Sequence, residues 1–284
     1  MTFEISKLET YCYASKDVIV GVADLTIEQA MSMINDHGFR RLPIVTETKL
    51  IGMVTVTDIL KFFGANRGKR PINELFGEQI AQIMTENVLK LPCDAPLSEA
   101  AELMFQKRIG SLPLMSNDHL VGIFTERDLL ELIPKIPSEV AVRDIMTTHV
   151  RTASPQQTVF EAMEQMATVG FRRLPIITDD DGLVGIVCAT DLLRHLTDPR
   201  LKEGREEEIF ETPLEEIMTT SVVCIEPDTS LSKAAATMAW KRCGALPVID
   251  VAGAQCRYGR LIGIVTERDI LNEVAHPFLE TPKT

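Results

Sequence analysis

Four aspartates end the same seven-residue pattern, in which a glycine stands three residues before a threonine and the aspartate three residues after it. Thr-x-x-Asp is a helix capping box, so each copy predicts a helix that starts directly after a strand. Capping would also accept Glu, Ser or Asn, but all four copies carry Asp, and the third has Cys188 in place of threonine. A carboxylate at such a junction can accept two hydrogen bonds from a ribose diol. The candidate ribose-binding residues are Asp58, Asp128, Asp191 and Asp269, with Thr55, Thr125 and Thr266.

Six arginines near these aspartates are candidates for binding an anionic group, because the planar guanidinium matches the geometry of phosphate. Two adjacent pairs precede predicted strands, and two single arginines follow the threonines of the second and fourth patterns. Successive side chains near a strand point to opposite faces. We therefore expect one arginine of each pair to face a cleft and the other to form a surface or inter-repeat ion pair. The candidate phosphate-binding residues are Arg40, Arg41, Arg172, Arg173, Arg127 and Arg268.

These side chains belong to a unit that occurs four times. Residues 38–44 (GFRRLPI) recur unchanged as residues 170–176, and weaker copies stand at 110–114 (GSLPL) and 244–248 (GALPV). The two weaker copies have small, uncharged residues where the others have arginines, so we expect open space at these positions and no positive charge. Repeats two and four also share the tetrapeptide Thr-Glu-Arg-Asp, so odd repeats resemble odd and even resemble even. We infer that an ancestral pair of repeats was duplicated.

The first repeat shows the order of elements. An apolar run at 18–22 is followed by a capping box at 26–29, two further apolar runs at 42–45 and 50–54, and the helix start near Asp58. This order predicts strand, helix, strand, strand, helix. Repeats two to four open with an Ile-Met pair that the first repeat lacks, and the fourth has a longer hairpin loop at about 251–260.

The fold class predicted is α/β (α+β), with four tandem repeats paired into two modules. The expected segments are a lead-in at 1–17, repeats at 18–75, 76–136, 137–200 and 201–275, and a tail at 276–284. The modules then span 18–136 and 137–275.

Composition narrows the possible functions. The net charge of −12 disfavours nucleic-acid binding through a general positive field. Six scattered cysteines have no zinc-ligand spacing and predict buried thiols in a reducing compartment. No leader-like or membrane-length apolar run is present, so we expect a cytoplasmic protein. With no P-loop, no metal cluster and no set of nucleophile, base and orienting group, the sequence does not predict an enzyme.

The four glycine-to-aspartate patterns, in phase with Leu-Pro in every repeat and with Ile-Met in three, resemble CBS domains, the regulatory modules called after cystathionine β-synthase. In that family two repeats pair as a Bateman module with two clefts for adenosine-containing ligands, and two modules can stack into a disk. The four-repeat layout is similar to that of the gamma subunit of AMP-activated protein kinase. The resemblance implies ribose and phosphate roles for the aspartates and arginines above. It also implies that backbone of the first strands contacts adenine, at Ile19, Val20, Leu89, Lys90, Arg151 and Val223.

The leading hypothesis is a non-catalytic sensor, a monomer or homodimer, that binds AMP, ADP or ATP and signals occupancy to a partner protein. One alternative is a binder of S-adenosylmethionine or methylthioadenosine, which carry the same ribose but need less positive charge. A ligand-free structural scaffold is the other. The sequence departs from the family in two ways. Cys188 replaces the hydroxyl residue of the third site, which weakens the expectation that this site binds ligand. The Arg-Arg pairs lie in the odd repeats, whereas the gamma subunit has its His-Arg pairs in the even ones.

Overall fold

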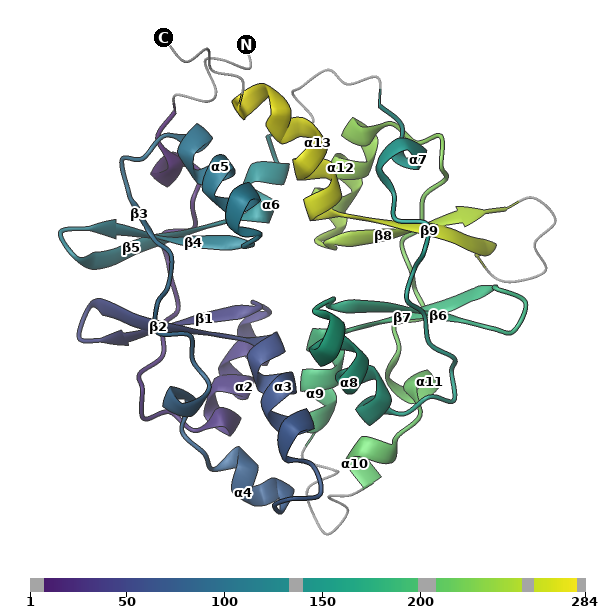
Figure 1. Cartoon of the computed structure of the whole chain (residues 1–284), viewed down its shortest axis with the longest axis horizontal. Helices are drawn as coiled ribbons and strands as arrows, with labels where there is room; N and C mark the ends of the chain where they lie inside the picture. Colours follow the sequence, from purple (N-terminus) through teal and green to yellow (C-terminus); the bar gives the residue numbers. More distant parts are fainter. Residues whose placement is uncertain (1–7, 133–139, 199–207, 252–257, 280–284) are drawn as a thin grey trace.

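The computed structural model describes residues 8–132, 140–198, 208–251 and 258–279. Figure 1 shows four repeats around a common centre, with the first two on one side and the last two on the other. The predicted boundary between the second and third repeats, near residue 137, and most of the longer hairpin loop of the fourth repeat lie outside the described residues. None of the described helices combines the length and hydropathy that crossing a bilayer requires.

Each repeat contains the predicted helix, strand, strand and helix in order, but the predicted first strand forms only in repeat two and is an isolated bridge in the other three. The first module contains η1 (Thr10–Cys12), α2 (Ile27–His37), β1 (Arg41–Thr46), β2 (Lys49–Thr55), α3 (Val56–Asn66), α4 (Ile72–Phe76), η2 (Ile80–Gln82), β3 (Leu91–Pro92), α5 (Leu97–Lys107), β4 (Ser111–Ser116), β5 (His119–Thr125) and α6 (Glu126–Leu130). The second contains α7 (Val142–Ile145), α8 (Val159–Val169), β6 (Arg173–Ile177), β7 (Leu183–Cys188), α9 (Ala189–Leu196), α10 (Glu208–Glu211), α11 (Leu214–Ile217), α12 (Leu231–Lys241), β8 (Ala245–Asp250), β9 (Arg260–Thr266) and α13 (Glu267–Leu279).

Local sequence signals account for the helix starts. Thr26 and Gln29 form the predicted reciprocal capping box at the start of α2, with hydrogen bonds of 3.2 and 2.9 Å. The predicted first strand of repeat one is reduced to a single parallel bridge between Gly21 and Ile44. The hairpin that follows is antiparallel with a register shift between Ile44 and Val45, and its pairing sets Arg41 directly opposite Thr55. The tight β1–β2 pairing therefore brings the arginine position beside the start of the aspartate-bearing helix.

The segments that open the repeats pack on the partner repeat of the same module. Thr85, after the Ile-Met pair of repeat two, bridges Met53 of repeat one, and Thr219 of repeat four bridges Ile186 of repeat three. In repeat one, which lacks Ile-Met, Ser15 of the lead-in bridges Ile123 of repeat two. This exchange of opening segments ties the two repeats of a module together.

The exchange of opening segments explains the glycine of the repeated pattern. A Cβ added at Gly52 would lie 2.6 Å from the Met84 sulfur, and one at Gly185 would lie 2.5 Å from the Met218 sulfur. At Gly122 the carbonyl of Ser15 and the Tyr11 ring take the place of methionine. The glycines are therefore packing positions for the opening segments.

Replacing Gly52 by alanine should lower the free energy of unfolding by about 1–3 kcal/mol, because the new methyl group overpacks against Met84. Gly64 is the matched control in the same repeat: it lies in α3, and a Cβ there would meet nothing within 4 Å. Gly64→Ala should stabilise by about 0.5–1 kcal/mol, since alanine favours the helix. Urea denaturation measures both; equal effects at the two positions would contradict the packing role.

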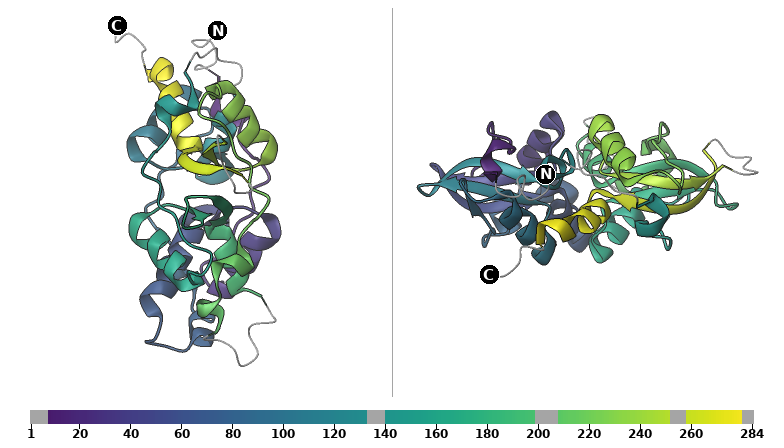
Figure 2. Two further views of the ribbon diagram at one scale, coloured as in Figure 1. Left: turned by 90° about the vertical axis from the view of Figure 1, so that its right-hand side faces the viewer. Right: turned by 90° about the horizontal axis from the view of Figure 1, so that it is seen from above.

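The hydrophobic core joins repeats of different modules. One cluster unites repeats one and three through residues such as Phe63 and Met163, and a second unites repeats two and four through residues such as Met104 and Met238. Helix α3 packs on α8, and α5 packs on α13. Within a module the contact is made by the hairpins instead, β2 with β5. Figure 2 shows the resulting flat disk from two further sides.

The cysteines differ from the prediction of buried thiols. Cys12 is exposed, and the other four described cysteines are only partly buried: Cys93, Cys188, Cys224 and Cys243. Cys256 lies outside the described residues.

Candidate functional site

Three cavities meet at the centre of the disk. The central cavity, of about 710 Å³, is lined by all four odd-repeat arginines and by Cys188, Thr190 and Asp191. A second cavity of about 400 Å³, here the Asp128 cleft, lies between repeats one and two. A third of about 350 Å³, the Asp269 cleft, lies between repeats three and four.

The aspartates are held by their caps and keep one carboxylate oxygen for other contacts. Oδ2 of Asp128 accepts hydrogen bonds from the backbone N–H and the hydroxyl of Thr125, at 2.7 and 2.8 Å. Thr55 and Thr266 bind Asp58 and Asp269 in the same way. Burial raises the pKa of Asp128 above its usual range. The capping function and a binding function are therefore compatible, because the cap uses one oxygen.

Asp191 is in a different environment. Its Oδ2 accepts the backbone N–H of Cys188, at 2.8 Å, and its Oδ1 lies 3.3 Å from the guanidinium of Arg194. Burial and the neighbouring carboxylate raise the pKa of the Cys188 thiol to about 11, so the thiol stays neutral at pH 7. The third site thus lacks the hydroxyl and has its second oxygen paired. In repeat one, Thr55 and Thr57 rather than Asp58 line the central cavity.

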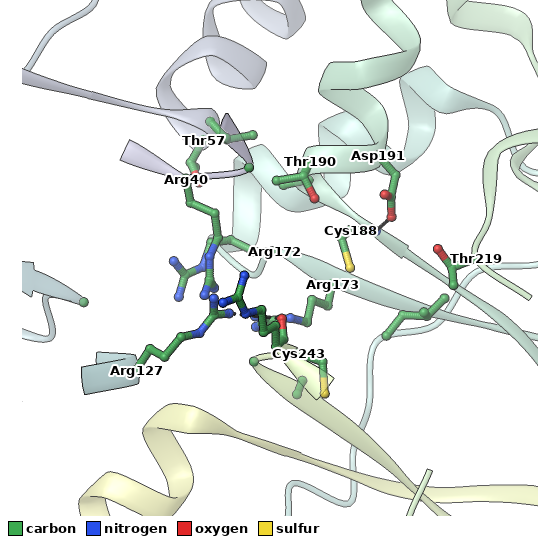
Figure 3. Close-up of a pocket in the computed structure, with 18 of the residues that line it drawn as sticks. Arg40, Thr57, Arg127, Arg172, Arg173, Cys188, Thr190, Asp191, Thr219 and Cys243 are labelled. Atoms are coloured by element: carbon green, nitrogen blue, oxygen red, sulfur yellow. Dashed lines mark hydrogen bonds between the residues drawn. The ribbon is translucent and has the colours of Figure 1, made fainter. Parts of the chain in front are cut away.

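Both arginines of each pair face the centre, so the expectation that only one would do so is wrong. Arg40, Arg172 and Arg173 converge in Figure 3 from the two odd repeats, and Arg127 reaches them from an even repeat. The guanidinium of Arg41 passes over Gly110 of the paired repeat, where a Cβ would overlap its Nη2. Arginine side chains are long enough to bend toward the same space, so strand alternation did not decide their direction.

The glycines of the even repeats make room for arginine side chains of the odd repeats. Gly110 accommodates Arg41, and Gly244 accommodates Arg173 in the same way. The room that the sequence predicted at these positions is filled by the arginine of the partner repeat.

Two buried glutamates complete the cluster, and the sequence reasoning missed them. Glu126 is 5% exposed and Glu267 is 2% exposed, each at the first position of its helix. The same position is Val56 and Ala189 in the odd repeats, both buried. The signal was available: Thr-Glu-Arg-Asp places an acidic residue where the other repeats have an apolar one, and a buried carboxylate requires cationic partners.

The two named clefts are built from equivalent residues. In each, an even-repeat Thr and Asp face the arginine pair of the odd repeat and the odd repeat's first-strand segment. The clefts differ at two equivalent positions of this segment. One position is Ile19 in the Asp128 cleft and Arg151 in the Asp269 cleft. Asp17 is likewise replaced by His149. The Asp269 cleft is therefore the more basic of the two at this end.

The candidate adenine contacts are distributed unevenly. Ile19, Arg151 and Val223 line cavities, the last of these the central one. Val20, Leu89 and Lys90 are exposed and are not among the residues that line these three cavities. Among the described residues no group of His, Cys, Asp and Glu side chains could hold a metal ion.

The family comparison agrees with this architecture. The CBS domain model matches residues 11–65, 80–135, 142–198 and 214–276. The chain belongs to the CBS-domain family and carries four repeats of it, as the sequence resemblance predicted.

The chain is similar to the protein MJ1225 of Methanocaldococcus jannaschii, with 32% identity over 92% of this chain and 96% of that protein. The crystal structure of MJ1225, described as a candidate archaeal homologue of γ-AMPK, superposes with a TM-score of 0.86 over 94% of this chain and 100% of the other. A 33.4 kDa protein of Thermofilum pendens is 32% identical over 83% of this chain and 80% of its own length. A structure from Pyrococcus horikoshii, 21% identical with a TM-score of 0.60 over 94% of this chain and all of the other, shares the fold.

Proposed function

We propose that this protein is a non-catalytic sensor that binds AMP, ADP or ATP in its clefts and signals their occupancy to a partner protein. The observation that carries the proposal is the matched construction of the Asp128 and Asp269 clefts. In each, a carboxylate suited to a ribose diol and a set of arginines suited to phosphate line one cavity.

The similarity to MJ1225 supports the same class of ligand, because that protein is described as a candidate homologue of γ-AMPK. The packing supports a signalling role. Each cleft lies between the repeats of one module, while the helix cores and the arginine cluster join the two modules. A ligand that binds one arrangement of the modules better than another shifts the population toward it, and a partner that contacts both modules responds.

Calorimetry distinguishes the proposed ligands from the thioether alternative. We expect wild-type protein to bind AMP, ADP or ATP, and Arg40→Ala with Arg172→Ala to weaken that binding by at least tenfold, because each arginine supplies charge-assisted hydrogen bonds. Binding of S-adenosylmethionine or methylthioadenosine should change little, since neither has a phosphate. Arg143, exposed and paired with Asp228 away from the cavities, supplies the control variant Arg143→Ala.

Two outcomes would contradict the proposal. Binding of the thioether ligands in preference to all three nucleotides would favour the alternative, and no binding of any of the five, together with no ligand released from the purified protein, would favour a scaffold. Native mass spectrometry reports the stoichiometry and the oligomeric state in the same sample.

A further inference from the structure

Glu126 and Glu267 stand at the centre of the six arginines and hold the modules together across the disk. Glu267 of repeat four lies 3.5 Å from Arg40 and 3.7 Å from Arg127, both in the first module. Glu126 of repeat two lies 3.6 Å from Arg172 and 3.0 Å from Arg268, both in the second module. The shortest ion pairs of each glutamate are therefore with arginines of the opposite module.

Those arginines are the same ones that line the opposite cleft. Arg40 and Arg127 line the Asp128 cleft together with Glu267. Arg172 and Arg268 line the Asp269 cleft together with Glu126. A phosphate that enters either cleft must compete with a resident carboxylate for its arginines.

We propose that Glu126 and Glu267 are internal competitors for the ligand's phosphate: each occupies the arginines of the opposite cleft in the free protein and yields them when phosphate binds. This inference rests on the proposed function only in requiring that the ligand carry a phosphate.

The charge of the cluster explains why a phosphate displaces a carboxylate. Six guanidinium groups surround the two buried glutamates, so positive charge exceeds negative charge around these carboxylates. Burial, together with the neighbouring arginines, lowers the pKa of Arg172 to about 9, and burial lowers that of Arg41 to about 10. A phosphate monoester carries about −1.5 to −2 and three acceptor oxygens, against one charge and two oxygens for a carboxylate.

The two glutamates are not held equally. Glu126 accepts two hydrogen bonds from Arg268, from Nε at 3.1 Å and Nη2 at 3.0 Å. Glu267 has its nearest arginine nitrogen at 3.5 Å, and its Oε1 and the Nε of Arg127 are buried without a hydrogen-bond partner in the described part of the chain. Unsatisfied buried polar groups are rare and costly. The arginines of the Asp128 cleft are thus more readily available, and this cleft fills first.

Binding in one cleft affects the other. When phosphate takes Arg40 and Arg127, the remaining close cation for Glu267 is Arg173, 4.0 Å away, which lines the Asp269 cleft. The released carboxylate then adds to the competition for the second phosphate. The two dissociation constants for AMP should therefore differ by at least about fivefold, the lower end of typical coupling between sites.

The test measures AMP, adenosine and inorganic pyrophosphate against four proteins: wild type, Glu267→Gln, Glu126→Gln and the control Glu164→Gln, an exposed position on α8. Removing either internal carboxylate should tighten AMP and pyrophosphate binding by about tenfold or more and leave adenosine unchanged, because a like charge within about 4 Å of the phosphate is gone. Glu164→Gln should match wild type. A fifth protein, the double variant Glu126→Gln/Glu267→Gln, should show a smaller ratio between its two AMP dissociation constants than the wild type.

A fall in affinity for AMP and adenosine alike would overturn the proposal, since it would mean that the glutamates position the clefts. An unchanged AMP affinity in every variant would overturn it too, while leaving the proposed function intact. Tighter pyrophosphate binding with no binding of AMP or adenosine would support the competitor role and refute the adenine ligand. If a glutamine variant does not fold, Glu267→Asp withdraws the carboxylate by one methylene and should give the same direction with a smaller gain.

Discussion

Asp128→Ala and Asp269→Ala are each expected to remove one AMP-binding event and, combined, to abolish AMP binding at concentrations that saturate the wild type. Each carboxylate can accept two hydrogen bonds from a ribose diol, and hydrogen bonds to a charged group contribute about 1.5–3 kcal/mol each. Their loss corresponds to about a 10²- to 10⁴-fold fall in affinity at that cleft. Calorimetric titration of the two single variants and the double variant measures the effect.

The control must separate loss of the ligand contact from loss of the helix cap. Asp144 provides it: its Oδ2 caps α7 by accepting the N–H of Ala141 at 2.9 Å, at an exposed position outside the three cavities. Asp144→Ala should therefore leave AMP affinity at the wild-type value. Wild-type AMP affinity in the double variant Asp128→Ala/Asp269→Ala would refute the ribose assignment.

Phe63→Ala should lower the free energy of unfolding by about 3–5 kcal/mol, the largest effect on stability that we expect from a single substitution here. Phe63 is fully buried in the core that repeats one and three share, and its ring centroid lies 5.1 Å from that of Phe76. Truncation leaves a cavity in the contact between the modules. Urea denaturation followed by circular dichroism measures the change.

Phe105 is the matched control, because it also lies in an eleven-residue helix but is 43% exposed. Phe105→Ala should cost much less, about 1 kcal/mol or below, since most of the ring is already in water. Similar losses for the two variants would argue against a core that spans the modules.

Much of each repeat follows from local sequence. The capping box at Thr26 forms as predicted, and Thr158 forms one too, because a threonine oxygen and a side chain three residues later satisfy the free N–H groups of one helix turn. The hairpins follow from short apolar runs joined by turns. The prediction overestimated the extent of the first strand of repeat one, because its pairing consists of one bridge, at Gly21.

The candidate site was predicted less completely. The sequence placed Asp128 and Asp269 at strand-to-helix junctions, and both line cavities with arginines. It misjudged the direction of the arginine pairs, because alternation along a strand fixes where Cβ points but not where a long side chain ends. It missed Glu126 and Glu267, which look like ordinary first-turn acids of a helix until their burial is known.

The sequence by itself determined the CBS repeat, its four copies, the odd and even classes and the positions of the aspartates, because these depend on residues close together in the chain. Only the tertiary structure decided that the cores join repeats one with three and two with four. It alone also decided that Arg40 meets Glu267, 227 residues away. Such contacts depend on how two modules stack, and no local pattern encodes that arrangement. For the same reason, the competition we propose between carboxylate and phosphate exists only in the assembled disk.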